Sequence, residues 1–69
     1  MNLVEIGVGE KCEILEIGQR CERLADMGVR VGDEAVKMVD NGGGIILRVG
    51  DVTLALCKRI SEKIIVRKA

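Results

Sequence analysis

The chain has 69 residues, with 11 basic and 11 acidic side chains and no histidine, proline or aromatic residue. This length predicts one domain, residues 1–69, close to the lower limit for independent folding, with a core built from nine Val, eight Ile and six Leu. Zero net charge disfavours nucleic acid as a partner, because nucleic-acid-binding domains usually carry a basic excess.

The N-terminal part of the chain predicts an apolar lead-in followed by one curved strand. An apolar segment at residues 3–6 precedes a glycine turn at 7–9, and residues 11–14 alternate as a half-buried strand does. The alternation then changes phase. This change predicts either a β-bulge at Ile14 and Leu15 or a change of strand partner at that point.

The segment from Gln19 to Met27 predicts a helix too short to be stable without packing against the sheet. Its expected apolar face consists of Cys21, Leu24, Ala25 and Met27. Gly28 follows at the position where a left-handed C-terminal cap favours glycine. Residues 29–31 alternate as an extended segment, and Gly32 with Asp33 predicts the turn before the next strand.

The next strand is expected from Glu34 to Val39, with Val36 and Met38 on one face and Lys37 on the other. Residues 41–44, Asn-Gly-Gly-Gly, predict a mobile hairpin loop. These glycines lack the strand–loop–helix context of a phosphate-binding loop, so we expect no nucleotide there.

Residues 45–49 and 52–56 form the clearest hairpin, because Gly50-Asp51 suits a two-residue type II′ turn. This register places on the core face the pairs Val49 with Val52, Leu47 with Leu54 and Ile45 with Leu56. The opposite face carries the pairs Arg48 with Thr53 and Ile46 with Ala55. The turn chemistry therefore predicts both the pairing and the buried face.

A single helical turn at residues 58–63, with Ile60 facing the core, and a closing strand at 64–66 complete the expected elements. Five short strands around one aliphatic core predict a mainly β fold. The architecture expected is a small SH3-like β-barrel with one short α-helix and one C-terminal helical turn.

The two ends of the chain carry opposite charge. Residues 1–34 hold eight acidic and four basic side chains, whereas residues 57–69 hold five basic and one acidic. We expect the two ends to lie close together and attract each other. The alternative is a dipolar surface that orients a partner.

Cys12, Cys21 and Cys57 are expected to be buried free thiols, because each lies beside apolar residues and none forms a CxxC pair. An odd number of cysteines without a secretory or membrane-spanning segment favours the cytosol and no direct membrane insertion. The sequence contains no catalytic constellation, so we expect no enzyme activity, no cofactor and no resident metal.

At this level of detail the sequence resembles the ferrous iron transport protein A family, FeoA, over nearly the whole chain. The resemblance is concentrated in the pattern Arg23-Leu24-x-x-Met27-Gly28-Val29-x-x-Gly32, whose structural motif is Leu24, Met27, Gly28 and Gly32. It also includes Leu3, Ile6, Gly7, Gly9 and Glu10 and the later strands. Family members usually have proline where this chain has Val31, and Gly-x-Pro in the loop that here is glycine-rich.

The resemblance implies a small cytoplasmic protein of bacterial ferrous iron uptake and an association with transition metal ion binding. It implies a non-enzymatic accessory that binds the cytosolic domain of the ferrous iron transporter B. One alternative is a generic SH3-like interaction domain that binds a peptide or weakly self-associates. Another is a regulatory domain like the C-terminal one of iron-dependent repressors. The lack of aromatic residues disfavours a proline-rich ligand.

We expect Arg23, Val29 and Arg30 to bind the partner, because loops held by a rigid scaffold concentrate binding residues and arginine is a frequent interface anchor. The alternative is that Arg23 is only solvated and Val29 packs inward. A competing patch on the outer hairpin face consists of Ile46 and Ala55, with Ile65 beside them.

Overall fold

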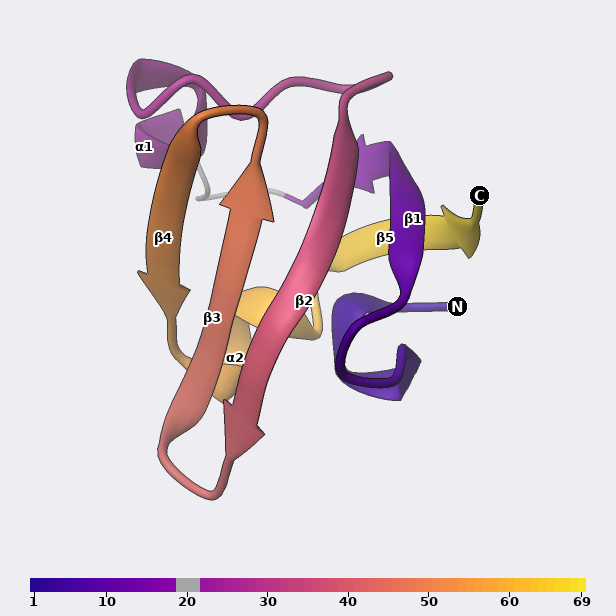
Figure 1. Cartoon of the computed structure of the whole chain (residues 1–69). Coiled ribbons are helices and arrows are strands. Elements are labelled where there is room, and N and C mark those ends of the chain that lie inside the picture. The colour runs from indigo at the N-terminus through magenta and orange to yellow at the C-terminus, as the bar shows by residue number, and fades with distance from the viewer. Residues whose placement is uncertain (19–21) are drawn as a thin grey trace.

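The computed structural model describes residues 1–18 and 22–69 and contains one antiparallel sheet of five strands in the order β4-β3-β2-β1-β5 (Figure 1). The strands are β1 (Lys11–Ile17), β2 (Glu34–Asn41), β3 (Gly44–Val49), β4 (Val52–Leu56) and β5 (Ile64–Lys68). The helices are the 3-10 helix η1 (Leu3–Glu5), α1 (Glu22–Asp26) and α2 (Lys58–Ser61). The expected mainly β, SH3-like fold is confirmed, although β4 and β5 remain the two edges of the sheet and do not pair.

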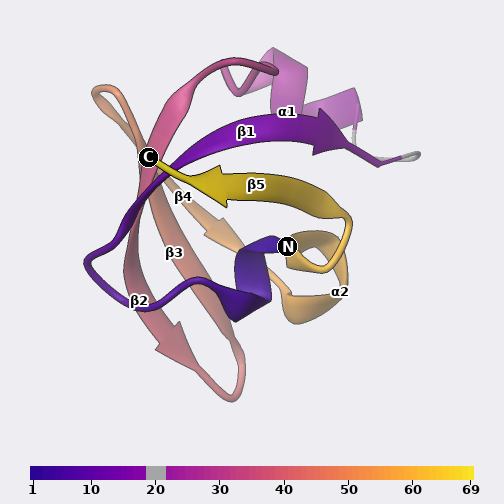
Figure 2. The ribbon, with the colours of Figure 1, turned by 90° about the vertical axis from the view of Figure 1, so that its right-hand side faces the viewer.

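The sheet curls, and the pairings of both β1 and β2 contain a register shift. Figure 2 shows β1 and β5 crossing in front of β2, β3 and β4, so that the sheet folds over its own core. The pairing of β1 with β5 shifts register between Ile14 and Glu16, which leaves Leu15 outside the ladder and 42% exposed. The first residues of β1 also pair with β2. Both the predicted bulge and the predicted change of partner are therefore present.

The β3–β4 hairpin has the predicted register. Its five pairs, including Leu47 with Leu54, follow from the two-residue turn at Gly50-Asp51, where Gly50 has φ +60°. The prediction that all six apolar residues of these pairs are buried is wrong for one of them. Val52 is 40% exposed because it lies at the end of the hairpin, on the edge strand.

The β2–β3 connection is tighter than the loop expected at residues 41–44. Asn41, the last residue of β2, pairs with Gly44, the first residue of β3, so the turn is only two residues long. The Asn41 side-chain oxygen accepts hydrogen bonds from the backbone N–H groups of Gly43 (2.8 Å) and Gly44 (3.1 Å). This Asx-type turn satisfies two backbone N–H groups that an open loop would leave exposed to water.

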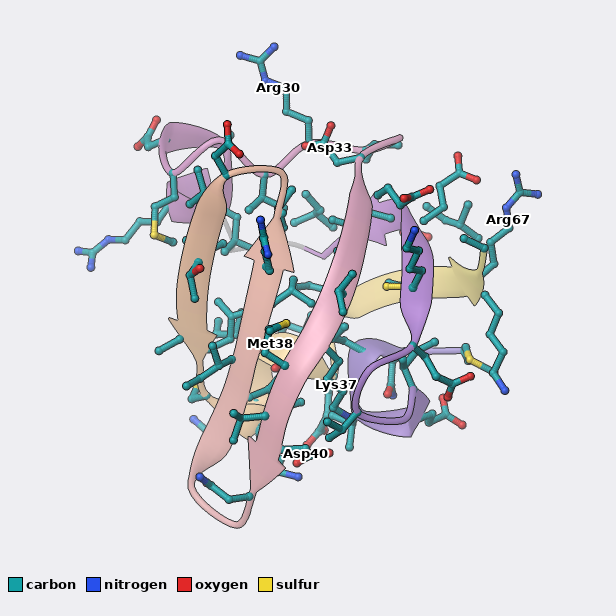
Figure 3. All side chains as sticks on the ribbon, in the orientation of Figure 1. Arg30, Asp33, Lys37, Met38, Asp40 and Arg67 are labelled. Atoms are coloured by element: carbon teal, nitrogen blue, oxygen red, sulfur yellow. The ribbon has the colours of Figure 1, made fainter. Side chains whose placement is uncertain are left out.

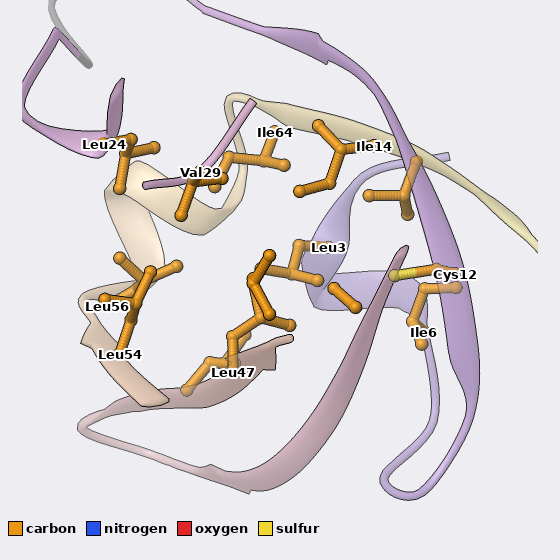
Figure 4. Close-up of a cluster of buried hydrophobic side chains, with 14 residues drawn as sticks. Leu3, Ile6, Cys12, Ile14, Leu24, Val29, Leu47, Leu54, Leu56 and Ile64 are labelled. Carbon is orange, nitrogen blue, oxygen red and sulfur yellow. The ribbon is translucent and has the colours of Figure 1, made fainter. Parts of the chain in front are cut away.

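The core is aliphatic and continuous across the sheet (Figure 4). Its buried residues are Leu3, Ile6, Cys12, Ile14, Leu24, Val29, Ala35, Ile45, Leu47, Val49, Leu54, Leu56, Ile64 and Val66. Ile60 of α2 packs against them, as predicted. Of the cysteines, Cys12 is buried as expected but Cys57 is exposed, and Cys21 lies outside the described residues.

The predicted apolar face of the first helix is only partly correct. Its first residues, 19–21, lie outside the described part of the chain, and α1 is described from Glu22 to Asp26. Leu24 is buried, but Ala25 is exposed and Met27 is 41% exposed. Among the side chains of this element that the structure describes, Leu24 alone reaches the core.

Candidate functional site

The loop after α1 begins with a Schellman motif. The Val29 N–H donates to the Leu24 carbonyl (2.8 Å), and the Gly28 N–H donates to the Ala25 carbonyl (3.0 Å). Gly28 has φ +94°, which confirms the predicted left-handed cap. This motif usually brings the residue after the glycine against the last helical turn. Val29 is accordingly 1% exposed and lies in the core with Leu24.

The tight turn at residues 30–33 contains the turn predicted at Gly32 and Asp33, and it also includes Arg30 and Val31 of the extended segment expected at residues 29–31. The Asp33 N–H donates to the Arg30 carbonyl (3.1 Å), and the Asp33 carboxylate accepts a hydrogen bond from the Arg30 N–H (3.0 Å). Gly32, the third residue of this turn, has φ +96°. A type II turn requires that backbone conformation, and it favours proline at the position of Val31.

The same turn is joined to β1 by two further backbone hydrogen bonds. The Gly32 N–H donates to the Ile14 carbonyl (2.7 Å), and the Ile14 N–H donates to the Asp33 carbonyl (2.9 Å). Ile14 is the residue at which the register of β1 shifts. The loop is therefore attached to the rigid part of the sheet and holds a defined position.

The structure places the three predicted partner residues in two different environments. Arg23 on α1 and Arg30 on the turn are exposed, and Arg30 points away from the body of the protein (Figure 3). Val29 is buried, so it positions the loop and offers no surface to a partner. The apolar surface of this loop comes instead from Met27 and Val31, which are 41% and 62% exposed. The burial of Val29 was predictable from the Schellman pattern, which pairs it with Leu24.

Next to this loop the surface is hollowed in two adjoining places. One depression of about 390 Å³ is lined by Gly28, Asp33, Glu34, Val49 and Gly50. The other, of about 320 Å³, is lined by Glu34, Val36, Met38, Arg48 and Gly50. Because they share Glu34 and Gly50, they form one shallow groove, which runs from the loop onto the outer face of β2 and β3. Met38 lies on this outer face (Figure 3).

The competing patch is divided by the fold. Ile46 and Ala55 are cross-strand neighbours on the outer face, as predicted, and Ala55 is exposed. Ile65 lies on β5, at the opposite edge of the sheet, where it forms a bridge with Asn2. The expectation that Ile65 lies beside the other two is wrong.

Lys37 is buried, which the sequence did not lead us to expect. Val36 and Met38 do share the face opposite Lys37, but the face that carries Lys37 is the one turned toward the core. The Lys37 ammonium donates to the carbonyls of Leu3 (3.2 Å), Val4 (3.0 Å) and Ile6 (2.6 Å). The only signal in the sequence was that Lys37 lies in phase with Ala35, and one alanine does not identify a buried face.

Asp40 links this lysine to α2. Its carboxylate lies 2.6 Å from the Lys37 ammonium and 2.7 Å from that of Lys58. Hydrogen bonds from Lys37 first, and from Lys58 second, hold the pKa of Asp40 below its ordinary value. This ionic cluster connects η1, β2 and α2 on the side of the sheet away from the Gly28 loop (Figure 3).

The two ends of the chain lie side by side, as their charges predicted. β1 pairs with β5, and Arg67 forms an ion pair with Glu13 (2.6 Å) while Lys68 lies 3.3 Å from Glu10. The pKa of Glu10 is lowered, mainly by the hydrogen bond from the Gly7 N–H and also by Lys68. Part of the opposite charge of the two ends is therefore paired within the fold.

The thiols differ in their surroundings. Burial raises the pKa of the Cys12 thiol, and the nearby Glu34 carboxylate raises it further. Within residues 1–18 and 22–69, no group of three or more histidine, cysteine, aspartate and glutamate side chains is arranged to hold a metal ion. None of the described helices has the length and apolarity to cross a membrane.

Comparisons with known proteins point to one family. The sequence model of the FeoA domain family matches residues 1–68. The chain is 30% identical to an iron uptake regulatory protein (FeoA) of known crystal structure, covering 100% of this chain and 96% of that one with a TM-score of 0.89. No curated protein sequence matches this chain.

Two more distant structures share the fold alone. One is the Stenotrophomonas maltophilia FeoA complexed with zinc, described as an SH3 domain protein, with 18% identity, coverage of 97% and 89% of the two chains and a TM-score of 0.85. The other is a manganese-dependent transcriptional repressor, with 16% identity and a TM-score of 0.90, where all of this chain matches 41% of the repressor.

Proposed function

Because the chain belongs to the FeoA domain family, we propose that it is a non-enzymatic accessory of bacterial ferrous iron uptake that binds the cytosolic domain of the ferrous iron transporter B in the cytoplasm. The extent of the family match along the chain carries this proposal. The FeoA domain match extends over residues 1–68, and the similarity to an iron uptake regulatory protein covers the whole chain. The repressor-like alternative has only the shared fold in its favour, at 16% identity.

The surface that we propose for this contact comprises Arg23 and Arg30 with the adjoining groove. Neither arginine forms an ion pair with another described side chain, and we propose that both guanidinium groups bind carboxylates of the partner. The Schellman motif and the turn at 30–33 fix the backbone that carries them. Binding therefore costs little ordering of the loop, which favours affinity.

The groove supplies a smaller apolar contribution. Val36 and Met38 contribute apolar surface to its lining, and Glu34 and Arg48 contribute opposite charges. An acidic and apolar segment of the transporter would match this arrangement, with its carboxylates on the arginines and its apolar side chains on Met38. The proposal places the contact on the face opposite the Lys37–Asp40 cluster.

The test measures binding of the chain to the purified cytosolic domain of the transporter by calorimetry, with and without guanine and adenine nucleotides. We expect Arg30→Glu to weaken binding by about tenfold or more, as loss of an anchoring arginine usually does. The matched control is Arg59→Glu, which makes the same charge change on an exposed residue of α2. Circular dichroism checks that both variants remain folded.

The same experiment distinguishes the two candidate surfaces. Loss of binding with Ile46→Asp but not with Arg30→Glu would assign the contact to the outer hairpin face. Absence of binding by the unmodified chain, in every nucleotide state, would contradict the transporter as the partner.

A further inference from the structure

The two edges of the sheet are treated differently by the fold. Along β5, the Val66 N–H donates to the Met1 carbonyl (2.8 Å), and Ile65 forms a bridge with Asn2. The N-terminal residues therefore cover the edge of β5. Along β4, no described strand pairs on the side away from β3 (Figure 1). β4 is the open edge.

The hairpin register identifies the backbone groups that this edge presents. In a two-residue hairpin the residues that flank the turn, Val49 and Val52, form a hydrogen-bonded pair. Bonded and non-bonded pairs then alternate, so Thr53 and Ala55 direct their N–H and C=O groups away from β3. Both residues are exposed, and no loop hydrogen bond within the described residues reaches these groups.

This edge lacks the features that usually prevent strand pairing. Residues 52–56 read Val-Thr-Leu-Ala-Leu, with no charge, no proline and no bulge. The core is also least covered here. Leu54 and Leu56 are each 7% exposed, and Val52, whose side chain lies on the same face, is 40% exposed. An added strand would bury the remaining surface of all three.

We propose that β4 pairs antiparallel with β4 of a second copy of this chain, around a two-fold axis at Leu54. In this register Thr53 of each copy lies opposite Ala55 of the other, and their free backbone groups match as donor to acceptor. On the core face, Val52 of each copy meets Leu56 of the other and the two Leu54 side chains meet. Every core-face contact in this register joins two aliphatic side chains, and this chemical match favours a second copy as the occupant.

Charge does not oppose this association. The pairing brings no ionised side chain of the strand opposite another, and the zero net charge of the chain removes long-range repulsion between copies. One five-residue strand buries less surface than a permanent dimer needs. The dimer is therefore reversible and depends on concentration.

Sedimentation equilibrium over a range of protein concentrations tests the association. Ala55→Pro removes the outward N–H without breaking a bond to β3, and we expect it to raise the dimer dissociation constant by about tenfold or more. Ala55→Lys, which places a charge at the same position, covers the case in which the proline variant does not fold. The matched control, Met38→Lys, places the charge on the outer face of β2 and leaves the dimer unchanged.

Disulfide cross-linking tests the register, in a background with Cys21→Ser and Cys57→Ser. A hydrogen-bonded antiparallel pair has its Cα atoms about 5.5 Å apart, within disulfide range. Thr53→Cys chains mixed with Ala55→Cys chains are therefore expected to cross-link, while Thr53→Cys chains alone, offset by two residues, do not. A monomer at all concentrations, or a dimer insensitive to the Ala55 variants, would overturn the proposal. Exclusive pairing of this edge with an extended peptide of another protein would also overturn it.

Discussion

The Lys37 ammonium lies 2.6 Å from the Asp40 carboxylate, and the lysine side chain is 1% exposed. A buried charge is tolerated only when it is paired and hydrogen-bonded, and here three backbone carbonyls of the N-terminal segment complete the coordination. Lys58 approaches the same carboxylate from α2. One ionic cluster thus attaches the N-terminal segment and α2 to the sheet.

Replacement of Lys37 by methionine should destabilise the fold strongly. The substitution removes one of the two ammonium groups that pair with Asp40 and leaves the carbonyls of Leu3, Val4 and Ile6 without this donor. Leaving a buried acceptor without its donor costs about 1–3 kcal/mol. Urea unfolding measures this cost. The control is Lys63→Met on an exposed lysine, and a similar small change in both variants would contradict the role of the cluster.

Stability should fall at acid pH. The pKa values of Asp40 and Glu10 are lowered by their hydrogen bonds and lysine partners, so both carboxylates bind protons more weakly in the folded chain than in the unfolded one. Their contribution is fully present above the ordinary pKa values of 3.8 and 4.5, and it is lost as the pH falls through the lower folded values.

Thermal melts between pH 7 and pH 2 measure this dependence. Asp40→Asn should be less stable than the unmodified chain at neutral pH and should lose less on acidification. Parallel curves for the two proteins, separated by a constant difference down to pH 2, would show that Asp40 does not contribute to the acid transition.

The two described cysteines should react differently with an alkylating reagent. Cys57 is exposed, whereas Cys12 is buried and its thiol pKa is raised by that burial. In a Cys21→Ser background, Cys12 should react at least about a hundredfold more slowly than Cys57, because it becomes accessible only when the sheet opens. Peptide mass mapping after timed labelling reads both rates. The two rates should become similar in urea, whereas equal rates in the native protein would contradict the burial of Cys12.

The hairpin register predicts a contrast between two aliphatic residues of β4. Leu54 is 7% exposed and faces Leu47, so Leu54→Ala should cost about 2–5 kcal/mol of unfolding free energy. Val52 is 40% exposed on the same face, and Val52→Ala should cost less than about 1 kcal/mol. Chemical denaturation of dilute protein compares the two. Comparable losses of unfolding free energy in the two variants would contradict the difference in burial between Leu54 and Val52.

Short-range sequence patterns were sufficient to predict several structural elements. A two-residue turn beginning with glycine determines the pairing of Leu47 with Leu54, because turn length fixes hairpin register. The phase change near Leu15 marks the bulge, since side chains alternate strictly along a strand. Gly28 marks the helix end, because its positive φ is strained for other residues. Each of these features depends on neighbours a few residues away in the chain.

The tertiary structure alone decided which face of each element is covered. Lys37 is buried because the carbonyls at the end of η1, more than thirty residues earlier in the chain, provide its acceptors. Met27 is exposed and Val29 is buried, because the Schellman turn directs the chain after α1 back against the sheet. Val52 has the right phase for the core but lies on an edge that no described strand covers. Alternation determines which residues share a face, whereas burial depends on what packs against that face.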